Sequence, residues 1–249
     1  MRPISSRHAV AFILSLVLAV GFVGGALAAD PTFARLETDE GNILVVFYPE
    51  LAPHHVDNFV HLSRTGFYDG TKFHRIMPGF IIQGGDPNSK DMDPRNDGLG
   101  GPTLADILTE EDAEVVAQVN GLLESKGYTP ITGEALLKAE FSKTAHHLRG
   151  TFSMARSPRG LDTAGSQFFI CVDKTAQLDG QYSIFGHVVS GMEVADIIVN
   201  AEKNPAAGRD YPAVPVVLKK SVIIEGTNGL TPEEKAAWDA MPAGLKNVK

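Results

Sequence analysis

The sequence has only one cysteine, Cys171, in 249 residues, so it cannot form an intramolecular disulfide. Its stability must therefore come from packing of the chain. Basic residues are not in excess either, because 22 lysines and arginines stand against 30 aspartates and glutamates. A nucleic-acid-binding protein would be expected to present a basic face, so we expect no nucleic-acid partner.

Motifs for metals and phosphates are also missing. The three histidines between residues 54 and 61 lack the i, i+4 spacing of a ligand pair. The aspartates after residue 86 do not make a calcium loop, because Arg95 interrupts them and Leu104 replaces the bidentate glutamate. Residues 98–102, GLGGP, lack the Lys-Ser/Thr pair of a phosphate-binding loop. We expect neither a metal nor a cofactor.

The first residues have the pattern of an export signal. Two arginines precede an apolar run that starts at Ala9, and Ala26-Leu27-Ala28 follows that run. This order is typical of a secretory signal peptide, so we predict that residues 1–29 are removed by cleavage after Ala28 or Ala29. The alternative is an uncleaved anchor, because the apolar run is nearly long enough to span a bilayer. The predicted location is the periplasm or the outside of the cell.

Short strands separated by turn signals recur through the rest of the chain. The predicted strands are residues 33–36, 42–48, 73–83, 150–156, 166–172, 181–189 and 216–226. Helical spacing of apolar residues predicts two helices, at residues 53–66 and 191–200. Repeated short strands with two helices favour a closed antiparallel barrel.

One arginine lies within a strand of bulky apolar residues, in the stretch FHRIMPGFIIQGGDP at residues 73–87. Alternation along a strand predicts that Phe73, Arg75 and Met77 share one face. An arginine in such a strand is costly unless its guanidinium meets water, a carboxylate or a ligand. From this stretch alone, a snorkelling arginine at a sheet edge and a functional arginine fit equally well.

Four motifs follow one another along the chain: FHRIMPGFIIQGGDP, GTFSMARS, GSQFFI and LDGQYSIFGHVVSGMEV. Together they resemble the cyclophilin family of peptidyl-prolyl isomerases, from about Thr32 to Gly226. The resemblance implies a mainly β fold, a closed eight-stranded antiparallel β-barrel capped by two α-helices, over residues 30–226. It also implies an enzyme that rotates X-Pro peptide bonds in proline-containing polypeptides and assists their folding.

The resemblance further implies which residues form the site. Arg75 would be the catalytic residue, and Gln83 would contact the substrate carbonyl and orient the arginine. The residues implied to bind substrate are Phe80, Ile81, Ala155, Arg156, Gln167, Phe169, Leu178 and Tyr182. Without the resemblance, Phe80, Phe169 and Leu178 would be interpreted as ordinary core.

Two of these positions depart from the family. Arg156 replaces a common asparagine, which is tolerable because the main chain makes the contact there, and Tyr182 replaces a common histidine. A non-catalytic proline-peptide-binding chaperone on the same fold is the alternative function. Such a binder could keep the apolar site while losing the arginine, so the presence of Arg75, Gln83 and Phe169 together favours the enzyme.

Residues 103–142 exceed the usual family length, and their apolar spacing predicts an inserted helical segment with a helix from Thr109 to Lys126. We favour a helix packed on the outside of the barrel over a lid or partner surface near the groove. A short helix carrying Trp238 is predicted in the tail, residues 227–249. His146 and His147 are expected to be solvated loop histidines, and the protein is expected to be a monomer.

Overall fold

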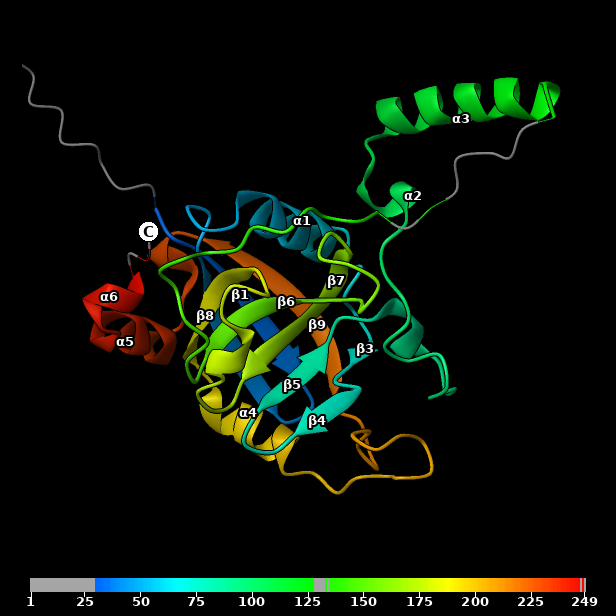
Figure 1. The fold of residues 1–249 in the computed structure, drawn as a ribbon. Coiled ribbons are helices and arrows are strands. Elements are labelled where there is room, and N and C mark those ends of the chain that lie inside the picture. Colours follow the sequence, from blue (N-terminus) through cyan, green and yellow to red (C-terminus); the bar gives the residue numbers. More distant parts are fainter. Residues whose placement is uncertain (1–29, 128–132, 134, 247, 249) are drawn as a thin grey trace, which may run out of the picture.

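The computed structural model describes residues 30–127, 133, 135–246 and 248, and the predicted signal peptide lies outside these ranges. Nine strands, all paired antiparallel, form one curled sheet within the described residues (Figure 1). The strands are β1 (Thr32–Thr38), β2 (Gly41–Phe47), β3 (Thr71–Lys72), β4 (Arg75–Met77), β5 (Ile81–Gly84), β6 (Thr151–Arg156), β7 (Ala164–Cys171), β8 (Ile184–Ser190) and β9 (Val217–Glu225). Across the described ranges, every helix is too short or too polar to traverse a bilayer.

The sheet runs in the order β3-β9-β1-β2-β8-β6-β7-β5-β4, so its two edge strands are β3 and β4. Only Phe73 and His74 separate these two strands in the chain, so the curled sheet comes back to itself through a covalent link. The predicted mainly β, antiparallel barrel-like fold is thus confirmed. The count of nine strands differs from the predicted eight because the predicted strand 73–83 is divided into β4 and β5, and the two-residue strand β3 precedes them.

A bend at Phe73 and His74, between β3 and β4, also changes which of the predicted residues share a face. The N–H of Phe73 donates to the carbonyl of Val216, whereas the N–H of Ile76 donates to the carbonyl of Asp210. Phe73 and Ile76 both lie in the main core. The prediction that Phe73 shares a face with Arg75 is therefore wrong, because the chain bends between the two residues.

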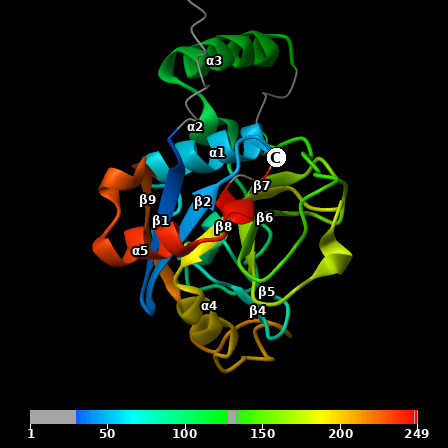
Figure 2. The same cartoon turned by 90° about the vertical axis from the view of Figure 1, so that its left-hand side faces the viewer.

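Two helices cap the barrel, as predicted: α1 (Pro53–Arg64) and α4 (Met192–Val199). Figure 2 shows them at opposite ends of the curled sheet. Proline is favoured at the first turn of a helix, where its missing N–H costs nothing, and Pro53 starts α1. Phe59 of α1 reaches the centre of the main core, where its ring packs against those of Tyr68, Phe152 and Phe168.

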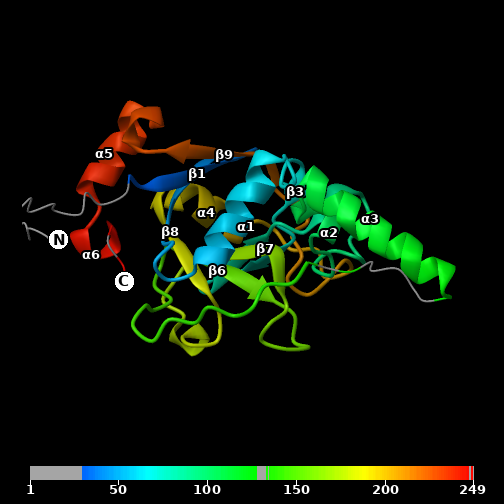
Figure 3. The ribbon, with the colours of Figure 1, turned by 90° about the horizontal axis from the view of Figure 1, so that it is seen from above.

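The inserted segment forms two helices, α2 (Leu104–Ile107) and α3 (Glu110–Ser125). The hydroxyl of Thr109 accepts from the N–H of Asp112 and caps α3, so this helix is confirmed. The prediction that it packs on the barrel is wrong. None of its residues is buried, and in Figures 1 and 3 it points away from the sheet. Helical spacing predicted the helix itself, and it carries no information about a packing partner.

The tail is built onto the barrel. It contains a short 3₁₀-helix, η3 (Thr227–Gly229), and two helices, α5 (Pro232–Ala240) and α6 (Ala243–Lys246). Glu234 of α5 makes a bidentate ion pair with Arg35 of β1, with both N–O distances 2.6 Å. The ring of Trp238 meets Phe33 edge-on at 5.1 Å. The tail therefore covers apolar residues of the outer sheet face.

Candidate active site

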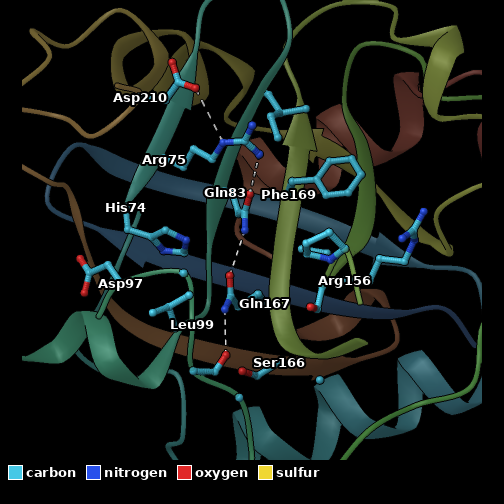
Figure 4. Close-up of a pocket in the computed structure, with 18 of the residues that line it drawn as sticks. His74, Arg75, Gln83, Asp97, Leu99, Arg156, Ser166, Gln167, Phe169 and Asp210 are labelled. Atoms are coloured by element: carbon cyan, nitrogen blue, oxygen red, sulfur yellow. Dashed lines mark hydrogen bonds and ion pairs between the residues drawn. The ribbon is translucent and has the colours of Figure 1, made fainter. Parts of the chain in front are cut away.

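A cavity of about 940 Å³ runs along the side of the barrel over β4, β5, β6 and β7. All ten predicted site residues line it: Arg75, Phe80, Ile81, Gln83, Ala155, Arg156, Gln167, Phe169, Leu178 and Tyr182. They come from the four strands β4, β5, β6 and β7, from the turn between β4 and β5, and from the segment between β7 and β8. Figure 4 labels five of them, Arg75, Gln83, Arg156, Gln167 and Phe169, around this cavity.

Arg75 is held at two points. It stands opposite Gln83 in the β4–β5 pair, and its Nη1 donates to Oε1 of Gln83 at 3.1 Å. Its Nε lies 3.9 Å from Oδ2 of Asp210, a residue in the loop before β9. The side chain nevertheless stays 42% exposed. The guanidinium is thus oriented by neighbours while much of it faces the groove.

A chain of amides continues from Arg75 along the groove. Nε2 of Gln83 donates to Oε1 of Gln167 at 2.9 Å, and Nε2 of Gln167 donates to the carbonyl of Gly100 at 2.8 Å. A side-chain amide has one accepting and one donating end. This sequence of bonds therefore turns the accepting oxygen of Gln83 toward Arg75, as Figure 4 shows.

An apolar cup lies beside Arg75 and is separate from the main core. Its buried members are Ile81, Phe169 and Cys171, against which Met77, Phe80, Ala155, Leu178 and Tyr182 pack. Phe80, Leu178 and Tyr182 are only half-buried and line the cavity. For Phe80 and Leu178, the interpretation as ordinary core therefore does not hold.

The strand β6 carries a bulge at the groove. Its register with β7 shifts between Met154 and Arg156, and Ala155 has no partner in that ladder. Bulges are common beside active sites because they redirect side chains and release main-chain groups from pairing. The Arg156 guanidinium lies over the Tyr182 ring at 4.7 Å, and its Nε donates to the carbonyl of Gln181 at 3.0 Å. The side chain of Arg156 thus braces Tyr182.

The cavity is also lined by residues that were not predicted to belong to the site, among them His74, Leu136 and Asp210. His74 precedes Arg75 and is buried, and burial lowers the pKa of its imidazole. Leu136 comes from the inserted segment, which returns to the sheet where the N–H of Leu137 donates to the carbonyl of Ala164. Neither Leu136 nor Asp210 belongs to a motif, so only the folded chain brings them to the groove.

One prediction about histidines is wrong. His146 is exposed, as expected of a loop residue, but His147 is fully buried behind Phe169. Sequence context did not distinguish them, because both precede the same strand. The difference arises from the direction in which each side chain leaves the loop.

Comparison with known proteins agrees with this geometry. Residues 33–222 match the sequence model of the family described as "Cyclophilin type peptidyl-prolyl cis-trans isomerase/CLD". A "Probable peptidyl-prolyl cis-trans isomerase" of Brucella abortus is 36% identical over 197 residues, 77% of this chain and 84% of that protein. "Peptidyl-prolyl cis-trans isomerase A" of Dickeya dadantii is 34% identical, over 88% of this chain and 99% of that protein.

Longer proteins and solved structures match as well. The chain spans 26% of the length of "Peptidyl-prolyl cis-trans isomerase-like 2" of Gibberella zeae, to which it is 33% identical over 77% of its own length. A crystal structure of a Cryptosporidium parvum cyclophilin type peptidyl-prolyl cis-trans isomerase, in the presence of the dipeptide Ala-Pro, matches with a TM-score of 0.59 and 26% identity. That match covers 79% of this chain and 99% of that one.

Proposed function

Because this chain belongs to the cyclophilin-type peptidyl-prolyl cis-trans isomerase family, we propose that it rotates X-Pro peptide bonds in proline-containing polypeptides, with Arg75 as the catalytic residue. Resonance makes the C–N bond partly double, so uncatalysed rotation takes tens to hundreds of seconds. A catalyst that completes this rotation in milliseconds lowers the barrier by roughly 7 kcal/mol. The enzyme would thereby assist the folding of its substrates.

The chemistry needs no proton transfer and no covalent step. In the twisted amide, the prolyl nitrogen becomes pyramidal and carries a localised lone pair, which is absent from the planar ground state. A fixed, charged donor near that nitrogen binds the twisted amide more strongly than the planar one and so accelerates rotation. Arg75 is always charged and has several donors in a rigid plane. Gln83 holds Nη1 and Asp210 lies near Nε, so Nη2 is left for the substrate.

The rest of the groove would hold the polypeptide. The cup formed by Phe80, Ile81, Phe169, Leu178 and Tyr182 is apolar and of the right character for a proline ring. The bulged main chain at Ala155 and Arg156 would bind the residue before the proline. Gln167 would contact the substrate main chain from the floor of the groove. These roles are proposals that follow from the family and from the positions of the residues.

One observation carries the proposal: the Arg75 guanidinium is held by Gln83 and still 42% exposed beside the apolar cup. A non-catalytic proline-peptide-binding chaperone would have no need for an oriented cation. A protease-coupled isomerisation assay on an Ala-Pro peptide tests this directly. Turnover well above the uncatalysed rate is expected. Suppression of client aggregation without turnover would instead support the chaperone.

We further propose that the protein is exported and acts as a monomer in the periplasm or outside the cell, without metal or nucleic acid. The proposal of export rests on the N-terminal arginines, the apolar run and Ala26-Leu27-Ala28. Mass spectrometry of the exported protein should find a mature N-terminus at Ala29 or Asp30. A membrane-extracted protein that retains Met1 would contradict cleavage. Light scattering of the purified protein tests the monomer.

A further inference from the structure

A buried imidazole lies directly behind the apolar cup. The ring of His147 is stacked on Phe169, with centroids 5.9 Å apart and planes 17° from parallel. It also meets the ring of Tyr182 edge-on, at 6.5 Å and 85°. Phe169 and Tyr182 in turn pack against each other at 5.5 Å. Phe169 and Tyr182, which both line the cavity, thus share a common support, His147, which stands one layer further from the groove.

Hydrogen-bonding groups lie at both nitrogens of this ring. Nδ1 lies 2.9 Å from Oδ1 of Asp179, and the main-chain N–H of His147 donates to the same oxygen at 2.7 Å. Because an ionised carboxylate only accepts, Nδ1 carries the hydrogen. Nε2 lies 3.2 Å from the hydroxyl of Ser153, whose single hydrogen can be donated either to Nε2 or to the carbonyl of Ser183 at 2.9 Å. An imidazole held in this way has little freedom to rotate.

Asp179 also fixes the part of the chain that carries two cup residues. It follows the 3₁₀-helix η2 (Ala176–Leu178), so Leu178 and Tyr182 lie on either side of it in the chain. Its second oxygen, Oδ2, lies 2.8 Å from Nδ1 of His146. Burial acts to raise the pKa of Asp179, but the hydrogen bonds from His147 and His146 outweigh burial and the pKa is lowered. The carboxylate is therefore ionised at neutral pH and holds both histidines.

We propose that His147 is a positioning residue for the isomerase. Clamped by Asp179, it supports the rings of Phe169 and Tyr182 in the arrangement that receives the proline ring of the substrate. It acts only through these two rings and touches no substrate. His147 is fully buried, so a smaller side chain in its place would leave a cavity into which the rings relax. The inference rests on the proposed function of the groove.

The effect should be on substrate binding rather than on the chemical step. The cup contacts the proline ring in both the planar and the twisted amide, and an interaction made equally in both states appears in KM and not in kcat. Loss of the aromatic contact between His147 and Phe169 should weaken peptide binding about three- to tenfold, which corresponds to the contribution of a typical aromatic pair. His147→Ala and His147→Gln should therefore raise KM by about that factor and change kcat less than about twofold.

His147→Phe separates the ring from its hydrogen bonds. The phenylalanine ring restores an aromatic support for Phe169, so KM should return most of the way to the wild-type value. It cannot donate a hydrogen bond to Asp179, so the melting temperature should fall below that of the wild type. His146→Ala is the matched control, because His146 contacts the same carboxylate but neither ring. KM and kcat would be measured on a tetrapeptide containing Ala-Pro, and Kd for the same peptide by calorimetry. A merely structural role would lower the melting temperature and the active fraction and leave KM and Kd unchanged.

Three results would overturn the proposal: KM and Kd of His147→Gln within about twofold of the wild type, an equal rise in His146→Ala, or no recovery in His147→Phe. The Gln and Phe variants decide the question even if His147→Ala does not fold. The Kd measurements are independent of turnover. If the wild type binds the peptide but does not isomerise it, the proposed function fails, while the positioning of the cup is still tested.

Discussion

Nη1 of Arg75 and Oε1 of Gln83 lie 3.1 Å apart at directly paired positions of β4 and β5. A short antiparallel pair at the edge of the barrel thus sets the orientation of the guanidinium. The partner oxygen is itself oriented by the amide chain through Gln167 to Gly100.

Arg75→Ala should lower kcat and kcat/KM together, by about a hundredfold, and leave the fold intact. Loss of a charge-assisted contact worth about 3 kcal/mol in the transition state has this effect. Arg75→Lys should recover little, because an ammonium cannot replace the planar set of donors. Steady-state kinetics on an Ala-Pro peptide provide the test, with thermal unfolding as the control. A stable Arg75→Ala protein with normal turnover would remove Arg75 from the mechanism.

Gln83→Leu should lower kcat/KM by about tenfold, since it removes a hydrogen bond of about 1.5 kcal/mol that orients the Arg75 guanidinium, the proposed catalytic group. Gln167→Leu should have a smaller effect, because Gln167 acts on Arg75 only through Gln83. Gln181→Leu is a matched control, since Gln181 is exposed and bonds only the carbonyl of Gln177 through its side chain. An effect of Gln167→Leu that exceeds that of Gln83→Leu would show that the amide chain acts directly on the substrate.

Replacement of residues 110–125 by a short Gly-Ser linker should change neither turnover nor the melting temperature appreciably, because α3 buries no residue. A loss of turnover in this variant would mean that α3 does act on the groove.

The part of the insertion that follows α3 should behave differently. Glu140 accepts from the N–H groups of His54 and His55 and pairs with the buried imidazole of His55. Glu140→Ala should therefore destabilise the fold by about 2 kcal/mol, as measured by urea unfolding.

Stability should fall as the pH falls from about 6.5 to about 4. Burial lowers the pKa of His187 from 6.5 to about 4, and burial also lowers the pKa of His55 and His147. Over this range the unfolded chain binds protons at these histidines and the folded chain does not, so unfolding becomes more favourable. His187 alone accounts for about 3 kcal/mol. Urea unfolding at several pH values checks this, and His187→Gln should flatten the curve.

Glu234→Ala should lower the free energy of unfolding by about 2 to 3 kcal/mol. The Arg35–Glu234 pair is mostly buried, with side-chain exposures of 15% and 9%, so its removal leaves a partly buried, unpaired guanidinium. Lys235→Ala, which breaks an exposed pair with Asp239 on the same helix, should cost less than about 0.5 kcal/mol. Equal losses in the two variants would mean that the tail is not a stabilising part of the fold.

Much of the fold was predictable because each element has a local cause. Strand alternation and turn residues indicate the strands, Pro53 and Gly66 mark the ends of α1, and Thr231 with Glu234 forms the capping box of α5. The ten predicted site residues converge on one cavity because their motifs lie on paired strands.

The remaining features depend on contacts between distant segments. Leu136 reaches the groove because its neighbour Leu137 bridges to Ala164, and Asp210 reaches Arg75 from the loop before β9. His147 is buried because Phe169 and Asp179 surround it, although its neighbour in the sequence faces solvent. No periodicity within these segments encodes such contacts. Apolar spacing likewise predicted α3 without indicating that it would stand alone.

The pairing of the first strand with the last has a consequence for how this chain reaches its native state. Phe33 of β1 lies opposite Ile224 of β9, so these two strands cannot pair until β9 has been synthesised. Contacts between residues so far apart in sequence are formed late and slowly in folding. Until then, the apolar face that α5 finally covers remains in water. The protein should therefore begin to act on other chains only after its own synthesis is complete.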